Sequence, residues 1–134
     1  MLVKFSLSTD AQDIRDYYEE HGYVIFKGLT DQSAIDSFLV EYQKVKQSKH
    51  FFYYSQSIHR WIKPALTEHG FIQESFENST RLLHALPFAR AVKRVLYADS
   101  VAQALSSVTG FKDFVSWQDM FFDRSTGTID HQDS

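Results

Sequence analysis

The chain has 134 residues, a net charge of −3, a pI near 6.0 and no cysteine. This length suits one domain with a core, and the lack of cysteine excludes disulfides, zinc–thiolate sites and cysteine nucleophiles. Lysine and arginine are scattered, without the basic segment of a nucleic-acid binder, and no apolar run approaches bilayer-spanning length. The apolar run at the start is also too short for a signal peptide. We therefore expect a soluble, cytoplasmic protein with no nucleic-acid partner and no membrane partner.

The first quarter of the chain predicts a helix followed by a short strand. Residues 9–12, Thr-Asp-Ala-Gln, form a capping-box pattern in which Gln12 can reach back to the Thr9 backbone. Helical spacing continues to Gly22, a residue suited to ending a helix. The β-prone run Tyr-Val-Ile-Phe at residues 23–26 then predicts a strand.

A second helix is predicted to begin after Thr30 or Asp31, because one apolar stripe runs from Ile35 to Val45 at helical spacing. Residues 51–54, Phe-Phe-Tyr-Tyr, fit either a strand or a packed loop, and this choice stays open. Residues 71–86 carry a helical pattern, although the pattern is interrupted.

The last third of the chain predicts two more helices and then a strand. Pro87 suits the first turn of a helix, and Ser100 can cap a shorter helix that Gly110 ends. Residues 114–122, rich in aromatic and β-branched side chains, predict a strand, and residues 123–128 a turn. The order of elements predicts an α+β fold, with a helical N-terminal layer followed by strands.

The sequence places His131 and Asp133 two residues apart on a segment expected to be extended. Residues i and i+2 of an extended segment point to the same side, so the two side chains can bind one metal ion. Imidazole and carboxylate are the ligands of the 2-His-1-carboxylate triad of non-haem Fe(II) oxygenases. Taken alone, such a pattern is more often a solvated turn than a metal site.

The other histidines do not have the spacing expected of a third ligand. These are His21, His50, His59, His69 and His84. Packing, helix-end or surface positions explain each of them.

Two stretches resemble the phytanoyl-CoA dioxygenase family. Residues 18–29, YEEHGYVIFKGL, are similar to the family's opening, and residues 117–133 are similar to its first metal-binding segment. The resemblance implies a double-stranded β-helix (jelly roll) that holds Fe(II) and 2-oxoglutarate. It makes His131 and Asp133 the first two iron ligands.

The resemblance also implies a wall for the cosubstrate. Gln118 matches the family pattern, whereas the lysine that often follows has no counterpart, and Arg124 is the candidate to replace it. The family's second iron-binding histidine and its 2-oxoglutarate-binding arginine also match no residue of this sequence.

We therefore expect residues 1–134 to be a single partial dioxygenase domain, truncated after the His-x-Asp motif and inactive by itself. In the complete enzyme a small-molecule or acyl substrate is implied, which the sequence does not identify. Two alternatives remain open: a non-catalytic interaction module derived from this fold, and a half-enzyme completed by another chain. An exposed strand edge at residues 117–122 would favour self-association.

Overall fold

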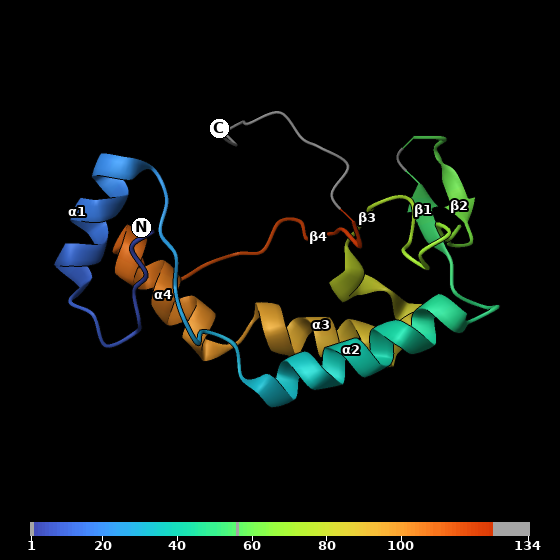
Figure 1. Cartoon of the computed structure of the whole chain (residues 1–134), viewed down its shortest axis with the longest axis horizontal. Coiled ribbons are helices and arrows are strands. Elements are labelled where there is room, and N and C mark those ends of the chain that lie inside the picture. Colours follow the sequence, from blue (N-terminus) through green and yellow to red (C-terminus); the bar gives the residue numbers. More distant parts are fainter. Residues whose placement is uncertain (1, 56, 125–134) are drawn as a thin grey trace.

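The computed structural model describes residues 2–55 and 57–124. Along the chain, its helices are α1 (Ala11–His21), α2 (Gln32–Gln47), the short 3-10 helices η1 (Ser79–Arg81) and η2 (Leu83–Ala85), α3 (Leu86–Leu96) and α4 (Asp99–Thr109). Its strands are β1 (Tyr53–Ser55), β2 (Arg60–Ile62), β3 (Phe76–Glu77) and β4 (Met120–Phe121). Helices α2 and α3 pack side by side, and α1 packs against α4 at one end of the molecule (Figure 1).

In the first two helices, two of the expected helix ends are present and one expected cap is wrong. Helix α1 ends at Gly22, whose φ of 76° is the left-handed conformation that glycine adopts without strain. It begins after Asp10, however, whose side chain accepts a hydrogen bond from the Gln12 N–H at 2.8 Å. Thr9 is not the cap, because its hydroxyl accepts a hydrogen bond from the Ser6 N–H at 3.2 Å instead. Asp31 caps α2.

The helices of the second half follow the expected positions with one further correction. Pro87 lies in the first turn of α3, as predicted. Helix α4 begins after Ala98, which has no side-chain cap, so Ser100 lies inside the first turn and does not cap the helix. Gly110 ends α4 in the left-handed conformation.

The strands form two separate antiparallel pairs. In β1–β2, Tyr54 lies opposite Trp61, and in β3–β4, Phe76 lies opposite Phe121. The strand expected at residues 114–122 is therefore only two residues long. The strand expected at 23–26 is reduced to an isolated parallel bridge between Phe5 and Phe26.

The helix expected across residues 71–86 is absent from the structure. This stretch contains β3, η1 and η2 in its place. The cause lies about forty residues away, because the Asn78 N–H donates to the Asp119 carbonyl at 2.8 Å and the Thr80 hydroxyl donates to the Asp119 carboxylate at 2.7 Å. Such distant partners outweigh a local helical pattern.

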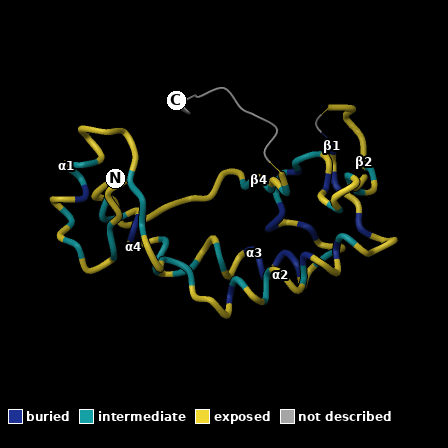
Figure 2. The backbone as a smooth tube through the Cα atoms, viewed as in Figure 1, coloured by how far each residue is buried: buried dark blue, intermediate teal, exposed yellow. Residues whose placement is uncertain are grey.

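The main core lies between the α2–α3 pair and the two small sheets, where the buried positions cluster (Figure 2). Phe76 is 1% exposed, and its ring centroid lies 5.8 Å from that of Phe51, 5.3 Å from Tyr53 and 5.1 Å from Phe121. The core consists of Tyr42, Val45, Phe51, Tyr53, Ile72, Phe76, Leu82, Phe88, Ala89 and Val92.

The described residues thus form an α+β fold, as predicted from the sequence. Within residues 2–55 and 57–124 the strands make only two-stranded sheets and no jelly roll. None of the described helices combines the length and the apolar character needed to cross a membrane.

Candidate functional site

The four residues that the sequence singled out fall into two groups. His131 and Asp133 lie outside the described residues, so their predicted role in metal binding stays a prediction. Gln118 and Arg124 lie within them, on either side of β4. Across the described ranges, no group of three or more His, Cys, Asp or Glu side chains is arranged to hold a metal ion.

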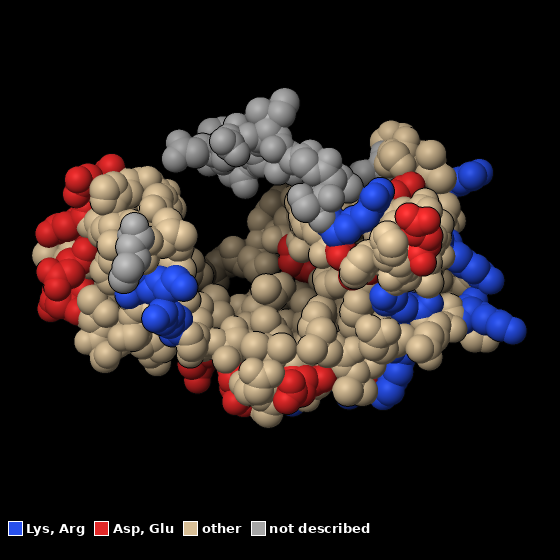
Figure 3. Space-filling view, viewed as in Figure 1, with Lys and Arg blue, Asp and Glu red and all other residues tan. Residues whose placement is uncertain are grey.

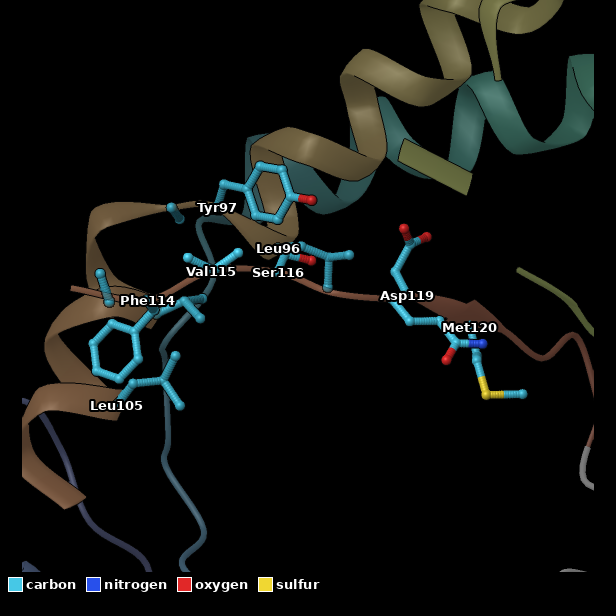
Figure 4. Close-up of a pocket in the computed structure, with 12 residues that line it drawn as sticks. Leu96, Tyr97, Leu105, Phe114, Val115, Ser116, Asp119 and Met120 are labelled. Carbon is cyan, nitrogen blue, oxygen red and sulfur yellow. The ribbon is translucent and has the colours of Figure 1, made fainter. Parts of the chain in front are cut away.

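Gln118 lines an open pocket of about 780 Å³ between the end of α3, helix α4 and the segment that leads to β4 (Figure 4). The walls are mainly apolar, with Leu105 from α4 facing Phe114 from the leading segment. The lining residues are Leu96, Tyr97, Ala98, Val101, Ala102, Leu105, Phe114, Val115, Ser116, Gln118, Asp119 and Met120.

Asp119 fixes the polar end of this pocket. Its carboxylate accepts hydrogen bonds from the Ser79 hydroxyl, from the Thr80 hydroxyl at 2.7 Å and from the Thr80 N–H at 3.3 Å. The Arg81 guanidinium donates to the Trp117 carbonyl at 3.3 Å. Hydrogen bonds from η1 therefore fix the position of the segment that precedes β4, and this segment forms one wall of the pocket.

Tyr97 is the titratable phenol at the same end. Hydrogen bonding from Ser116 first, and from Thr80 second, lowers the pKa of Tyr97 below its ordinary value. These donors stabilise the phenolate. Tyr97 is 49% exposed, so its phenol is open to solvent at the rim of the pocket.

Arg124 lies away from that pocket. Its Nε atom donates to the Gln73 carbonyl at 3.4 Å, and it is not among the lining residues. Gln118 lines the pocket and Arg124 does not, and their predicted role in cosubstrate binding stays a prediction.

Asp123 is a buried charge that the sequence did not single out. Its Oδ2 atom accepts a hydrogen bond from the Ile72 N–H at 2.6 Å and lies 3.8 Å from Lys46 Nζ. The Lys46 and Asp123 side chains are only 13% and 9% exposed. Burial first, and the adjacent Asp123 carboxylate second, raise the pKa of Tyr42 well above its ordinary value. Lys46 Nζ lies 5.2 Å from the centroid of the Tyr42 ring.

The histidines other than His131 lie on several elements, and two of them, His50 and His84, line one shallow pocket. His21 packs its ring on Tyr17 at 4.2 Å, and His84 Nε2 forms a hydrogen bond with the Phe52 carbonyl at 2.8 Å. His59 lies in the β1–β2 turn with a φ of 53°, and the His69 side chain is 76% exposed.

The fit to Fe(II) and 2-oxoglutarate can be judged from the donor types. The imidazole of His131 and the carboxylate of Asp133 are ligands that Fe(II) accepts. The cosubstrate half fits less well, because Gln118 faces an apolar pocket and Arg124 is bonded to a carbonyl elsewhere. The residue types at positions 131 and 133 therefore match two ligands of an iron site, whereas the surroundings of Gln118 and Arg124 do not match a cosubstrate site.

Sequence reasoning missed Asp119 and Asp123 as the anchors of this region. Both look like ordinary polar residues at the ends of a strand, and the hydrogen-bond partners of their carboxylates lie 39 to 51 residues away. No local spacing could have indicated them.

Comparisons with protein-family models, with curated proteins and with solved structures find no match to this chain.

Proposed function

We propose that this chain is the N-terminal part of an Fe(II)- and 2-oxoglutarate-dependent hydroxylase that resembles the phytanoyl-CoA dioxygenases. The observation that carries the proposal is the order of parts: a helical layer, then an anchored strand, then a His-x-Asp motif. Strand β4 pairs with β3, and Asp123 and Arg124 bind the backbone of residues 72 and 73. The chain entering the motif thus starts from a fixed position.

In this proposal His131 and Asp133 would ligate the iron through an imidazole nitrogen and a carboxylate oxygen. The bound iron and 2-oxoglutarate would supply the oxidation of an aliphatic C–H bond, with release of succinate and carbon dioxide. The third ligand and the arginine for 2-oxoglutarate would come from other polypeptide, either of the same protein or of another chain. The jelly roll belongs to that whole assembly. By itself this chain is expected to bind metal weakly and not to turn over.

Metal titration of the chain tests the role of the motif. We expect Co(II), used as a stable probe for Fe(II), to bind weakly, and either His131→Ala or Asp133→Asn to lower the affinity about tenfold or more. His69→Ala and Asp130→Asn are the matched controls. The first removes an imidazole that is exposed elsewhere on the surface, and the second removes a carboxylate next to the motif in the sequence. Equal affinities across all four variants would remove the proposal.

A second candidate is supported by a different observation. The segment between α4 and β4 exposes large apolar side chains, with Val115 93% and Trp117 86% exposed. Exposed apolar side chains next to a strand favour association with another chain. This supports a non-catalytic interaction module, or a half-enzyme whose partner supplies the remaining strands. If the chain is a half-enzyme, adding its partner would tighten Co(II) binding. Unchanged weak binding would count against completion by that partner.

A further inference from the structure

The β1–β2 hairpin carries an exposed aromatic face on the side away from the core. Tyr53 and Ser55 point inward and are 1% and 0% exposed, so Tyr54 between them points outward. Its cross-strand neighbour Trp61 is 60% exposed, with the two ring centroids 6.0 Å apart. Ile58, in the turn of the hairpin, is 46% exposed.

Basic side chains accompany this face. Lys63 Nζ lies 5.5 Å from the centroid of the Phe52 ring, beside the Tyr54–Trp61 pair. Arg60, at the start of β2, lies opposite the inward-pointing Ser55, so its side chain leaves the hairpin on the other face. Lys49 comes shortly before β1. Figure 3 shows several basic side chains over this end of the molecule, with some acidic side chains among them, and an acidic patch at the opposite end.

Two of the acidic residues near the hairpin are turned away from the face or paired with a lysine. Glu74 accepts hydrogen bonds from Ser55 and Ser57, on the inward side of β1, at 2.6 and 3.3 Å. Glu41 lies 2.6 Å from Lys44 Nζ. The acidic end consists of Asp10, Asp13, Asp16, Glu19 and Glu20, on or beside α1. Basic and aromatic side chains thus occur together at the hairpin end, whereas acidic residues are concentrated on and beside α1.

We propose that the outer face of the β1–β2 hairpin docks on membrane surfaces that carry anionic lipids. Tryptophan and tyrosine favour the headgroup region, where the ring is partly buried and its polar atom stays hydrated. Lysine beside them is attracted to anionic headgroups, and its apolar stem lies along the same surface. This inference does not depend on the proposed hydroxylase. It revises the expectation of no membrane partner, because the fold gathers basic residues that are scattered in the sequence.

The geometry favours a lipid surface over single-stranded nucleic acid. Stacking of bases requires open, roughly parallel ring faces. Here Trp61 meets Tyr54 at 73° and the His84 ring at 80°, so the rings meet edge to face. Ile58 adds an aliphatic side chain that a membrane interface accepts and a base does not stack on.

Vesicle sedimentation of the whole chain tests the proposal. We expect binding to phosphatidylcholine–phosphatidylserine vesicles about tenfold tighter than to phosphatidylcholine vesicles, and weakened by salt. Trp61→Ala should lower this binding several-fold, whereas Trp117→Ala, which removes the other exposed tryptophan, should leave it unchanged. In a Trp117→Phe background, the Trp61 fluorescence should shift to shorter wavelength when vesicles are added.

Charge reversal provides a second, independent variant. Lys63→Glu should lower binding several-fold, and Lys93→Glu on α3 changes the net charge equally as a control. Circular dichroism establishes that each variant is folded. Equal binding to both kinds of vesicle, equal loss in the two tryptophan variants or in the two charge-reversed variants, or no binding at all would overturn the proposal. Tighter binding to a single-stranded oligonucleotide than to vesicles would also overturn it.

Discussion

Lys46 of α2 and Asp123, two residues beyond β4, form a largely buried ion pair, with Nζ 3.8 Å from Oδ2. The same Oδ2 accepts the Ile72 N–H at 2.6 Å. One carboxylate therefore joins a helix, a loop and the end of a strand. Because both side chains are largely buried, the pair is poorly screened by solvent.

We expect Asp123→Ala to lower the free energy of unfolding by about 2–4 kcal/mol, since it leaves a buried ammonium and a backbone N–H without their acceptor. Urea denaturation measures this change. Lys44→Ala is the control, because Lys44 belongs to an exposed pair with Glu41 and should cost at most about 0.5 kcal/mol. Equal losses in the two variants would contradict the central position of Asp123.

Tyr53→Phe should stabilise the protein by about 1 kcal/mol. The Tyr53 hydroxyl is buried and has no hydrogen-bond partner among the described residues, so removing it removes a desolvation cost. Tyr23→Phe is the control, since Tyr23 is 44% exposed. Thermal unfolding of both variants at neutral pH measures the difference, and a Tyr53→Phe protein less stable than the parent would refute the assignment.

The protein should lose stability at alkaline pH through Tyr42. Its pKa in the folded state is raised above the ordinary value of 10.0, first by burial and then by Asp123. The resulting stability is complete below pH 10.0 and falls as the pH rises above it, because the unfolded chain then loses the proton more readily. Denaturation midpoints across this range should fall less steeply for Tyr42→Phe than for the parent. Parallel curves would exclude Tyr42 as the cause.

Phe76→Ala should cost about 3–5 kcal/mol, because it removes a ring that touches both small sheets and α3. Phe111→Ala is the matched control, since that ring is 70% exposed and its loss should change stability by less than about 0.5 kcal/mol. Chemical denaturation compares the two. A small effect at Phe76 would mean that the core lies elsewhere.

Val115→Lys should reduce any self-association without lowering stability, because Val115 is 93% exposed on the segment that leads to β4. Size-exclusion chromatography at several protein concentrations measures the association. Leu39→Lys on α2 is the control, since Leu39 is 48% exposed and lies on another element. A parent protein that stays monomeric at every concentration would weaken the interaction-module proposal.

The helices were predictable because their signals are local. A capping aspartate before α2, a proline at the start of α3 and glycines after α1 and α4 act within a turn of the residues that they affect. The misplaced caps at Thr9 and Ser100 are errors of one or two residues. At α1 the neighbouring Asp10 accepts the backbone hydrogen bond in place of Thr9. At α4 the helix begins after Ala98, and no side chain caps it.

The strands and the pocket were not predictable in the same way. Residues 71–86 carry a helical pattern, yet Asp119 and Phe121 draw part of this stretch into β3 and η1. Gln118 and Arg124 lie six residues apart in sequence, but β4 and its hydrogen bonds direct them to different surroundings. These outcomes depend on partners that no short window of sequence contains.

The hydrogen bonds between η1 and Asp119 have a kinetic consequence. Residues 79 and 119 are 40 positions apart, so their contact closes a long loop, and that closure costs conformational entropy. The α2–α3 pairing and the short hairpin need no contribution from the last part of the described chain. We expect folding to start with those parts and the β3–β4 pair to form last. Substitutions at Asp119 would therefore speed unfolding more than they slow refolding.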